Sequence, residues 1–387
     1  MPDTVTDSPI PFLDLPAQQA RLREALRARL EGVLAHCQFV LGPEVAELEQ
    51  RLAAFCGAQH CVGVSSGTDA LQIALMAEGI GPGDAVFLPA FTYTATAEVP
   101  LLLGATPVFV DIEEDTFQIA PASLERRIAQ TRARGLRPRA VIGVDLFGQP
   151  ADWPALLEIA RAHDLFTLDD AAQSFGATLH GRALGSWAQA SATSFFPSKP
   201  LGAYGDGGAL FTDDADRAAL YRSLRSHGEG TTRYEVLRTG MNGRLDTLQA
   251  AVLLAKLDAF PAELEARERV ARTYDTALGD TALSNVLRLP ARVADARAAW
   301  AIYAVLLPDS AQRDTLQSAL RAAGIPSAIY YPKPLHHQPA YQSAHDGTAL
   351  PVSEAVARRI MALPMHADLN EAQLARICRA VRAGCGV

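Results

Sequence analysis

The sequence predicts an α/β protein with a mostly parallel sheet in a large domain, followed by a smaller C-terminal domain. Three observations support this. The chain has 387 residues, which is long enough for two cores. Short β-rich runs alternate with helical patterns from about residue 60 to 212, and the alternation restarts after a long helical stretch. Strands that alternate with helices are typical of a parallel sheet.

Seven β-rich runs can be placed in the first region. The expected strands are 61–65, 85–89, 107–112, 140–146, 165–168, 192–196 and 209–212. The expected helices between them are 70–78, 123–134 and 153–163. Ligands of such sheets bind at the carboxyl ends of strands, so a site is expected in the loops that follow them.

The remaining patterns set the expected domain boundaries. An amphipathic helix at 18–34 should pack on the body or on a second subunit. A long helix from 244 to about 260 should end or kink at Pro261, before a second helix at 262–278. A strand near 301–307 and a helix at 311–323 then indicate an α+β domain. The expected division is an N-terminal segment 1–40, a large domain 41–260 and a small domain 261–387.

The composition excludes several classes of function. The net charge is −8 and the pI is about 5.6, so there is no basic excess to attract nucleic acid. The longest apolar run, 99–110, contains two prolines and is too short to span a membrane. The first residues lack a basic stretch followed by an apolar one, so no signal peptide is expected. The five cysteines are scattered, which indicates reduced thiols in the cytoplasm.

No metal site is expected. Cys56, His60 and Cys61 lie close together, but no second ligand pair follows at zinc spacing. His336 and His337 are adjacent, and on a strand their side chains would point apart, so one packed and one polar histidine are expected rather than a metal pair.

The segment 191–208 holds one lysine, Lys199, among hydroxyl, aromatic, proline and glycine residues. Pro197 and Pro200 bracket this lysine and exclude a regular helix. Desolvation on such a loop can lower the pKa of the amine, and a neutral amine can condense with a carbonyl. This is the chemistry of a pyridoxal phosphate (PLP) site, although most lysines of this kind are ordinary surface residues.

Polar residues follow three of the expected strands. Thr68 and Asp69 open the helix after 61–65, where free N–H groups favour a phosphate or where either residue is only an N-cap. Asp169 and Asp170 follow the run 165–168 and could pair with a protonated ring nitrogen, bind a metal or cap a helix. Tyr93 follows the run 85–89 and could stack on a planar cofactor or pack in the core.

A polar, glycine-punctuated region precedes the long helix. It contains Arg225, His227, Arg233, Tyr234, Arg238, Asn242 and Arg244. Such a region can clamp a phosphate or carboxylate, or form a flexible surface loop. Competing motifs are absent: there is no dinucleotide fingerprint, and Phe196 stands where an S-x-x-K motif needs serine.

Taken together, the motifs resemble the DegT/DnrJ/EryC1/StrS family of PLP-dependent nucleotide-sugar aminotransferases, which have the fold-type I architecture. The matching segments are Gly67-Thr68-Asp69-Ala70-Leu71, Asp170-Ala171-Ala172-Gln173-Ser174-Phe175-Gly176, Ser194-Phe195-Phe196-Pro197-Ser198-Lys199, Gly240-Met241-Asn242-Gly243-Arg244-Leu245-Asp246, Tyr331-Pro332 through Tyr341, and Leu363-Pro364-Met365-His366. The resemblance extends from about Pro11 to the end of the chain.

The resemblance implies roles for individual residues. Lys199 would form the imine with PLP and shuttle the proton, and Asp170 would pair with the pyridine nitrogen. The other implied contacts are Gln173 to the ring hydroxyl, Tyr93 stacked on the ring, and Gly67, Thr68 and Ser194 at the phosphate, joined by Asn242 of a second subunit. An active site shared in this way implies a homodimer.

Within the family, the sequence around Gln173 and Lys199 resembles the branch that aminates C3 of UDP-2-acetamido-2-deoxy-3-oxo-glucuronate, using L-glutamate, for bacterial surface polysaccharide such as O-antigen. Arg244 is the expected partner of the uronate carboxylate, with Tyr331 and His336 as further substrate contacts. The alternatives are a different 3-keto or 4-keto dideoxy sugar linked to TDP or GDP, and a non-catalytic regulatory protein on the same scaffold. A dehydratase of the family is disfavoured, because those relatives replace the lysine with histidine.

Overall fold

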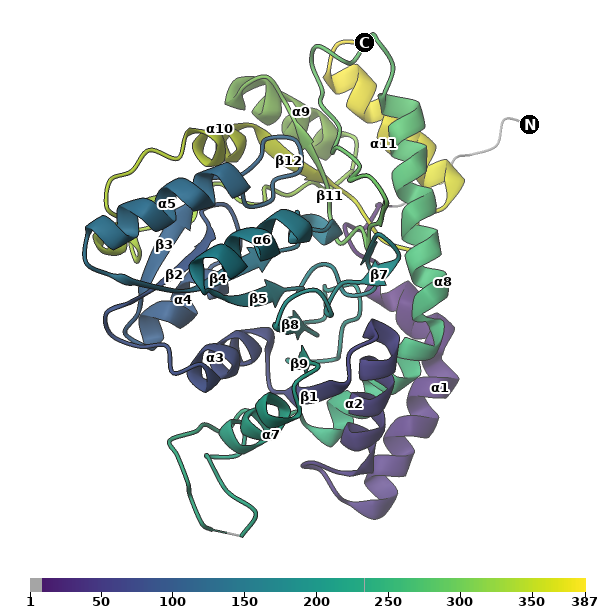
Figure 1. Ribbon diagram of the computed structural model, residues 1–387. Helices are drawn as coiled ribbons and strands as arrows, with labels where there is room; N and C mark the ends of the chain where they lie inside the picture. The colour runs from purple at the N-terminus through teal and green to yellow at the C-terminus, as the bar shows by residue number, and fades with distance from the viewer. Residues whose placement is uncertain (1–8, 233) are drawn as a thin grey trace.

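The computed structural model describes residues 9–232 and 234–387, and a seven-stranded sheet lies at its centre (Figure 1). The strands are β1 (His60–Val64), β2 (Asp84–Pro89), β3 (Thr106–Val110), β4 (Arg137–Val144), β5 (Phe166–Asp170), β8 (Ala190–Ser194) and β9 (Gly208–Thr212). Their order is β1-β9-β8-β5-β4-β2-β3. β9 pairs antiparallel with β1 and β8, and the other pairs are parallel.

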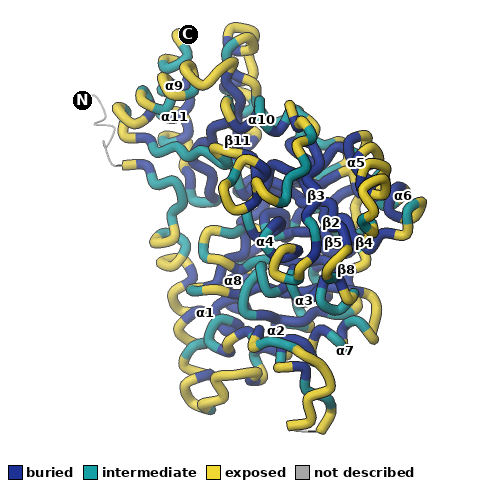
Figure 2. The backbone as a smooth tube through the Cα atoms, turned by 90° about the vertical axis from the view of Figure 1, so that its left-hand side faces the viewer, coloured by how far each residue is buried: buried dark blue, intermediate teal, exposed yellow. Residues whose placement is uncertain are grey.

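Helices cover both faces of this sheet, so its strands are buried on both sides (Figure 2). One face packs against α3 (Gly67–Ala77), α4 (Ala95–Leu102) and α7 (Ala215–Leu224). The other packs against α2 (Pro43–Cys56), α5 (Pro121–Ala133), α6 (Trp153–His163) and α8 (Thr247–Leu278). Every residue of β2, β5 and β9 is buried, so these strands lack the alternation of buried and exposed residues that a sheet with one solvent-facing side would show.

The C-terminal part has a core of its own, built around Tyr274, Trp300 and Tyr303. Its elements are β11 (Tyr303–Leu306), β12 (Ile360–Leu363), α9 (Ser310–Ala322), α10 (Pro351–Arg359) and α11 (Glu371–Gly384). The separate core around Tyr274, Trp300 and Tyr303 supports the proposed small domain.

Shorter elements lie between the longer ones along the whole chain. They are β6 (Thr178–Leu179), β7 (Arg182–Ala183), β10 (Ala296–Arg297) and the 3-10 turns η1 (Leu146–Gly148), η2 (Leu335–His337) and η3 (Gln342–Ala344).

The fold class and all seven expected strands are confirmed. The expected helix break at Pro261 is wrong, because α8 runs without interruption through this proline. Residues on both sides of it, such as Phe260 and Leu264, are buried against the body, and this packing outweighs the local cost of the proline. The proposed boundary at 260/261 therefore lies inside one helix.

The N-terminal helix α1 (Leu15–His36) lies along α8, as Figure 1 shows. Leu22 and Leu26 of α1 pack against Val252 and Ala255 of α8. Among the described helices, none combines the length and apolar character needed to cross a membrane.

One buried carboxylate connects the sheet to the C-terminal part. Asp111, which directly follows β3, is 7% exposed. Its carboxylate accepts hydrogen bonds from Ser353 N at 2.8 Å, Ser353 Oγ at 2.7 Å and Val352 N at 3.1 Å. These N–H groups belong to the first turn of α10, whose own N-cap residue, Leu350, makes no side-chain cap. Asp111 therefore caps a helix that is distant in the sequence.

We predict that Asp111→Ala lowers the free energy of unfolding by about 2–4 kcal/mol, since buried donors lose a charged acceptor. The matched control is Asn370→Ala, which removes an exposed cap from α11 and should cost about 1 kcal/mol. Chemical denaturation of both variants measures the difference. Equal losses would show that Asp111 is no more than an ordinary cap.

Candidate active site

The carboxyl ends of β1, β2, β5 and β8 lie at one edge of the sheet, and the loops after them surround a cavity of about 390 Å3. Eight of the residues expected at a site line this cavity. They are Gly67, Thr68, Tyr93, Asp170, Gln173, Ser194, Lys199 and Tyr331. Residues that are far apart in the sequence thus meet because the parallel strands end together.

Lys199 lies on the loop after β8, at the wall of this cavity. Pro197 and Pro200 keep the loop out of regular structure, and Lys199 N donates to Phe196 O at 2.8 Å. The surrounding protein removes most of the water from the amine. This desolvation lowers the pKa of Lys199, and the negative charge of Asp170 partly offsets the effect.

Asp170 is the last residue of β5 and is 7% exposed. Its Oδ2 accepts a hydrogen bond from Thr96 Oγ1 at 3.0 Å, and its Oδ1 accepts one from Ala172 N at 3.3 Å. Burial raises the pKa of this carboxyl, while the charge of Lys199 and the hydrogen bond from Thr96 counteract the rise. The cavity therefore holds a carboxylate and an amine that both have little water around them.

Gln173 is fixed by contacts on both ends of its amide. Its Oε1 accepts from Phe147 N at 2.6 Å, and its Nε2 donates to Tyr331 Oη at 3.3 Å. Tyr331 also lies near Tyr93, with ring centroids 6.4 Å apart. Tyr93 is 56% exposed and lines the cavity, so its ring is free to stack on a planar ligand.

The N-terminus of α3 forms a narrow cradle at the same edge. Ser66 caps the helix by accepting a hydrogen bond from Asp69 N at 3.0 Å. The N–H groups of Gly67 and Thr68 lie in the first turn and therefore have no helical partners. A Cβ atom on Gly67 would lie 2.7 Å from the Cβ of Ser194. This close approach requires glycine, and it places a hydroxyl beside the positive end of a helix, as an anionic phosphate needs.

Three expected site residues lie outside this cavity lining. Asn242 is exposed and pairs through its backbone with Ser226, and Arg244 pairs in the same way with Val64. His336 is buried at 3% exposure, and burial lowers its pKa to about 4. The structure therefore does not support a substrate contact by His336 within its own chain.

One arginine of the polar region before α8 has a structural role. Arg225 is buried and donates to Glu49 and to Gly63 O, so it links α7 to β1 and is not available as a ligand clamp. Arg233 lies outside the described residues.

Sequence reasoning missed two groups that support the site. Thr96 holds Asp170, but this threonine lies in α4, a helix that was not expected. Asp145 follows β4 and accepts from Ser174 Oγ at 3.0 Å and from Ala151 N at 2.8 Å, which fixes the loop that carries Gln173. The position of Asp145 at a strand's carboxyl end was the signal that could have revealed it.

Comparison with known proteins decides the family. The model of the DegT/DnrJ/EryC1/StrS aminotransferase family matches residues 20–382. The chain belongs to this family. It is 45% identical over 372 residues to the UDP-2-acetamido-2-deoxy-3-oxo-D-glucuronate aminotransferase of Pseudomonas aeruginosa, covering 96% of this chain and 99% of that one. It is 40% identical to the UDP-N-acetyl-3-dehydro-alpha-D-glucosamine 3-aminotransferase of Acidithiobacillus ferrooxidans, covering 96% and 97%.

Solved structures share the whole fold. A DegT DnrJ EryC1 StrS aminotransferase from Brucella abortus superposes with a TM-score of 0.94 at 47% identity, covering 98% of this chain and 100% of that one. NtdA from Bacillus subtilis, solved with its cofactor PMP bound, gives a TM-score of 0.89 at 27% identity and covers 98% and 86%. The protein is a PLP-dependent sugar aminotransferase, and the cavity offers groups that suit this cofactor: an amine, a buried carboxylate and a helix N-terminus.

We predict that Asp170→Asn lowers the pKa of Lys199 further in the cofactor-free protein, because it removes the negative charge that favours the ammonium form. The chain has only three lysines, Lys199, Lys256 and Lys333. NMR titration of the 13C-methylated amines, assigned with Lys→Arg variants, can therefore follow Lys199 individually. An unchanged or higher pKa would contradict the pairing.

Proposed function

We propose that the protein transfers the amino group of L-glutamate to C3 of UDP-2-acetamido-2-deoxy-3-oxo-D-glucuronate. The observation that supports the reaction type is the desolvated Lys199 amine in one cavity with the Asp170 carboxylate. The observation that supports this substrate is the near full-length similarity to the Pseudomonas relative named for it. The product would be an amino sugar for surface polysaccharide.

When bound, PLP supplies an electron sink for the carbon that loses its proton. The role of Lys199 follows from its lowered pKa, because a larger neutral fraction of the amine can accept a proton from carbon and return it. The charge of Lys199 and the hydrogen bonds from Thr96 and Ala172 favour the carboxylate form of Asp170 against the effect of burial, and this carboxylate would hold a proton on the pyridine nitrogen. Both are the catalytic residues of the proposal.

The other cavity residues would bind and orient the cofactor. Gly67, Thr68 and Ser194 would hold the phosphate at the N-terminus of α3. Gln173 would reach the ring hydroxyl, and Tyr93 would stack on the ring. These roles rest on where the side chains lie and on the family pattern.

We propose that the active protein is a homodimer with shared sites. A loop projects from the body after α7 (Figure 1). Asn242 and Arg244 lie where this segment returns to the body, paired with Ser226 and Val64, and both lie outside the cavity lining of their own chain. This segment also exposes apolar side chains, with Val236 61% and Leu237 56% exposed. A second copy that covers these residues would bring Asn242 to the phosphate and Arg244 to the substrate of the neighbouring site.

We expect Lys199→Ala to abolish transamination. The matched control is Lys333→Ala, which removes an exposed lysine and should leave the rate unchanged. The assay follows glutamate formed from 2-oxoglutarate and the UDP-linked 3-amino uronic acid, because this direction starts from stable compounds. Substantial turnover by Lys199→Ala would remove Lys199 from the catalytic role.

Arg244→Met is predicted to lower kcat/KM for the uronic acid roughly 10- to 100-fold, the value of a lost hydrogen bond to a charged group. The matching sugar without the carboxylate should lose much less with the same variant. Measuring both substrates on both proteins gives the comparison. An equal loss for the two sugars would place Arg244 away from the carboxylate.

The same assay separates the alternatives. Faster turnover of UDP-linked 3-amino N-acetylglucosamine would favour the activity named for the Acidithiobacillus relative. Turnover of TDP- or GDP-linked amino sugars alone would move the substrate to another branch. No turnover with any of them, in protein that binds PLP, would support a regulatory role.

A further inference from the structure

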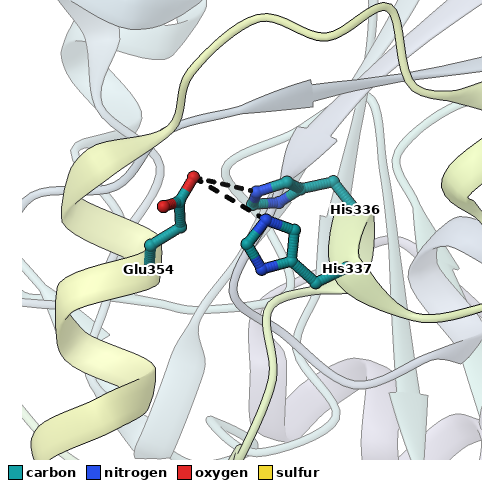
Figure 3. A group of neighbouring side chains, drawn as sticks. All are labelled: His336, His337 and Glu354. Atoms are coloured by element: carbon teal, nitrogen blue, oxygen red, sulfur yellow. Dashed lines mark hydrogen bonds and ion pairs between the residues drawn. The ribbon is translucent and has the colours of Figure 1, made fainter.

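Two histidines and a glutamate converge outside the cavity (Figure 3). His336 and His337 lie in η2, and Glu354 lies in the first turns of α10. The Nε2 atoms of His336 and His337 are 3.4 and 3.8 Å from Glu354 Oε1. Within residues 9–232 and 234–387, this is the one group of three such side chains whose donor atoms all lie within 4.8 Å of one another.

The expectation of one packed and one polar histidine is confirmed, since His336 is buried and the side chain of His337 is 50% exposed, but the expectation that they point apart is wrong. That expectation assumed a strand, in which successive side chains alternate between faces. The segment is instead a 3-10 turn, and the two imidazole rings lie on the same side, with centroids 4.2 Å apart.

The donor atoms have the chemistry and spacing of a transition-metal site. Two imidazole nitrogens and one carboxylate oxygen form a common ligand set for zinc. Zinc binds such ligands at about 2.0–2.2 Å, so two ligand atoms at a tetrahedral angle lie about 3.3–3.5 Å apart. The contact from His336 already has this spacing, and the contact from His337 needs to shorten by only a few tenths of an ångström.

The surrounding structure holds the ligands in place and leaves the site accessible. His336 is buried, with its ring 6.3 Å from that of Phe109, and Leu335 N donates to Ala90 O at 2.7 Å. Glu354 lies on the helix whose first turn is capped by Asp111. The side chains of His337 and Glu354 are 50% and 29% exposed, so an ion can enter from solvent.

We propose that His336, His337 and Glu354 form a binding site for one divalent transition-metal ion of the zinc type, with water at the remaining coordination positions. The ion ties η2 to α10. Because η2 lies only a few residues after Tyr331 of the active-site cavity, the site stabilises the segment that carries this tyrosine. The proposal stands independently of the sugar substrate.

The test uses Zn2+ alone as the probe, with chelator-treated, PLP-loaded, full-length protein. All proteins carry Cys37→Ser, so that the exposed thiol does not bind the metal. Bound zinc is measured by elemental analysis and by competition with a chromophoric chelator. The variants are His337→Gln and Glu354→Gln, which change partly exposed side chains and are expected to fold. The matched control is His163→Gln, because His163 also contacts a glutamate, Glu125 at 2.8 Å, but has no second histidine beside it.

We expect one zinc ion per chain and a melting temperature that rises on adding zinc. His337→Gln and Glu354→Gln should each weaken zinc binding by more than about 100-fold and should remove the thermal shift. A loss of this size exceeds the roughly 10- to 100-fold expected when a residue only supports a metal ligand. His163→Gln should behave like the parent. Absence of a stoichiometric ion in the parent, or equal affinity in the parent and both site variants, would overturn the proposal and leave a cluster held by hydrogen bonds alone.

Discussion

The site depends on keeping an amine and a carboxylate together where little water reaches either. Burial lowers the pKa of Lys199 and raises that of Asp170, because it destabilises the charged form of each group. The opposite charge of the partner then partly stabilises each charged form. The sheet supplies the rigidity for this arrangement. Asp170 ends a fully buried strand, and Thr96 and Ala172 fix its two oxygens, so the carboxylate cannot swing out to solvent.

The sheet topology explains why the remaining parts assemble at the same edge. Parallel strands end together, so the cradle at the N-terminus of α3, the Lys199 loop and the Tyr93 loop surround one cavity. The C-terminal part closes this cavity with Tyr331, whose hydroxyl accepts from Gln173. Asp111 joins the two parts away from the chemistry by capping α10, and the histidine and glutamate cluster lies between that helix and the Tyr331 segment.

The sheet and much of the cavity could be predicted from the sequence. Several buried parallel strands appear as apolar runs, and the residues that directly follow such a run lie at the edge of the sheet where the cavity is. Lys199, Asp170 and the Gly67 turn were found in this way. The path of α8 through Pro261 was not, because packing on both flanks decides it. The convergence of His336 and His337 was also missed, because a 3-10 turn and a strand place neighbouring side chains differently. Arg244 and Asn242 were expected at the site but lie outside the cavity of their own chain, because their backbones pair with Val64 and Ser226 instead.

The most direct test of the central claim is the visible absorption of the purified protein before and after adding L-glutamate. If Lys199 holds PLP beside Asp170, the cofactor band should be present and should be replaced by the spectrum of the amino form when glutamate is added. Lys333→Ala should behave in the same way, and Lys199→Ala should not convert. The absence of any cofactor band after incubation with PLP, or conversion that is equally fast without Lys199, would contradict the account.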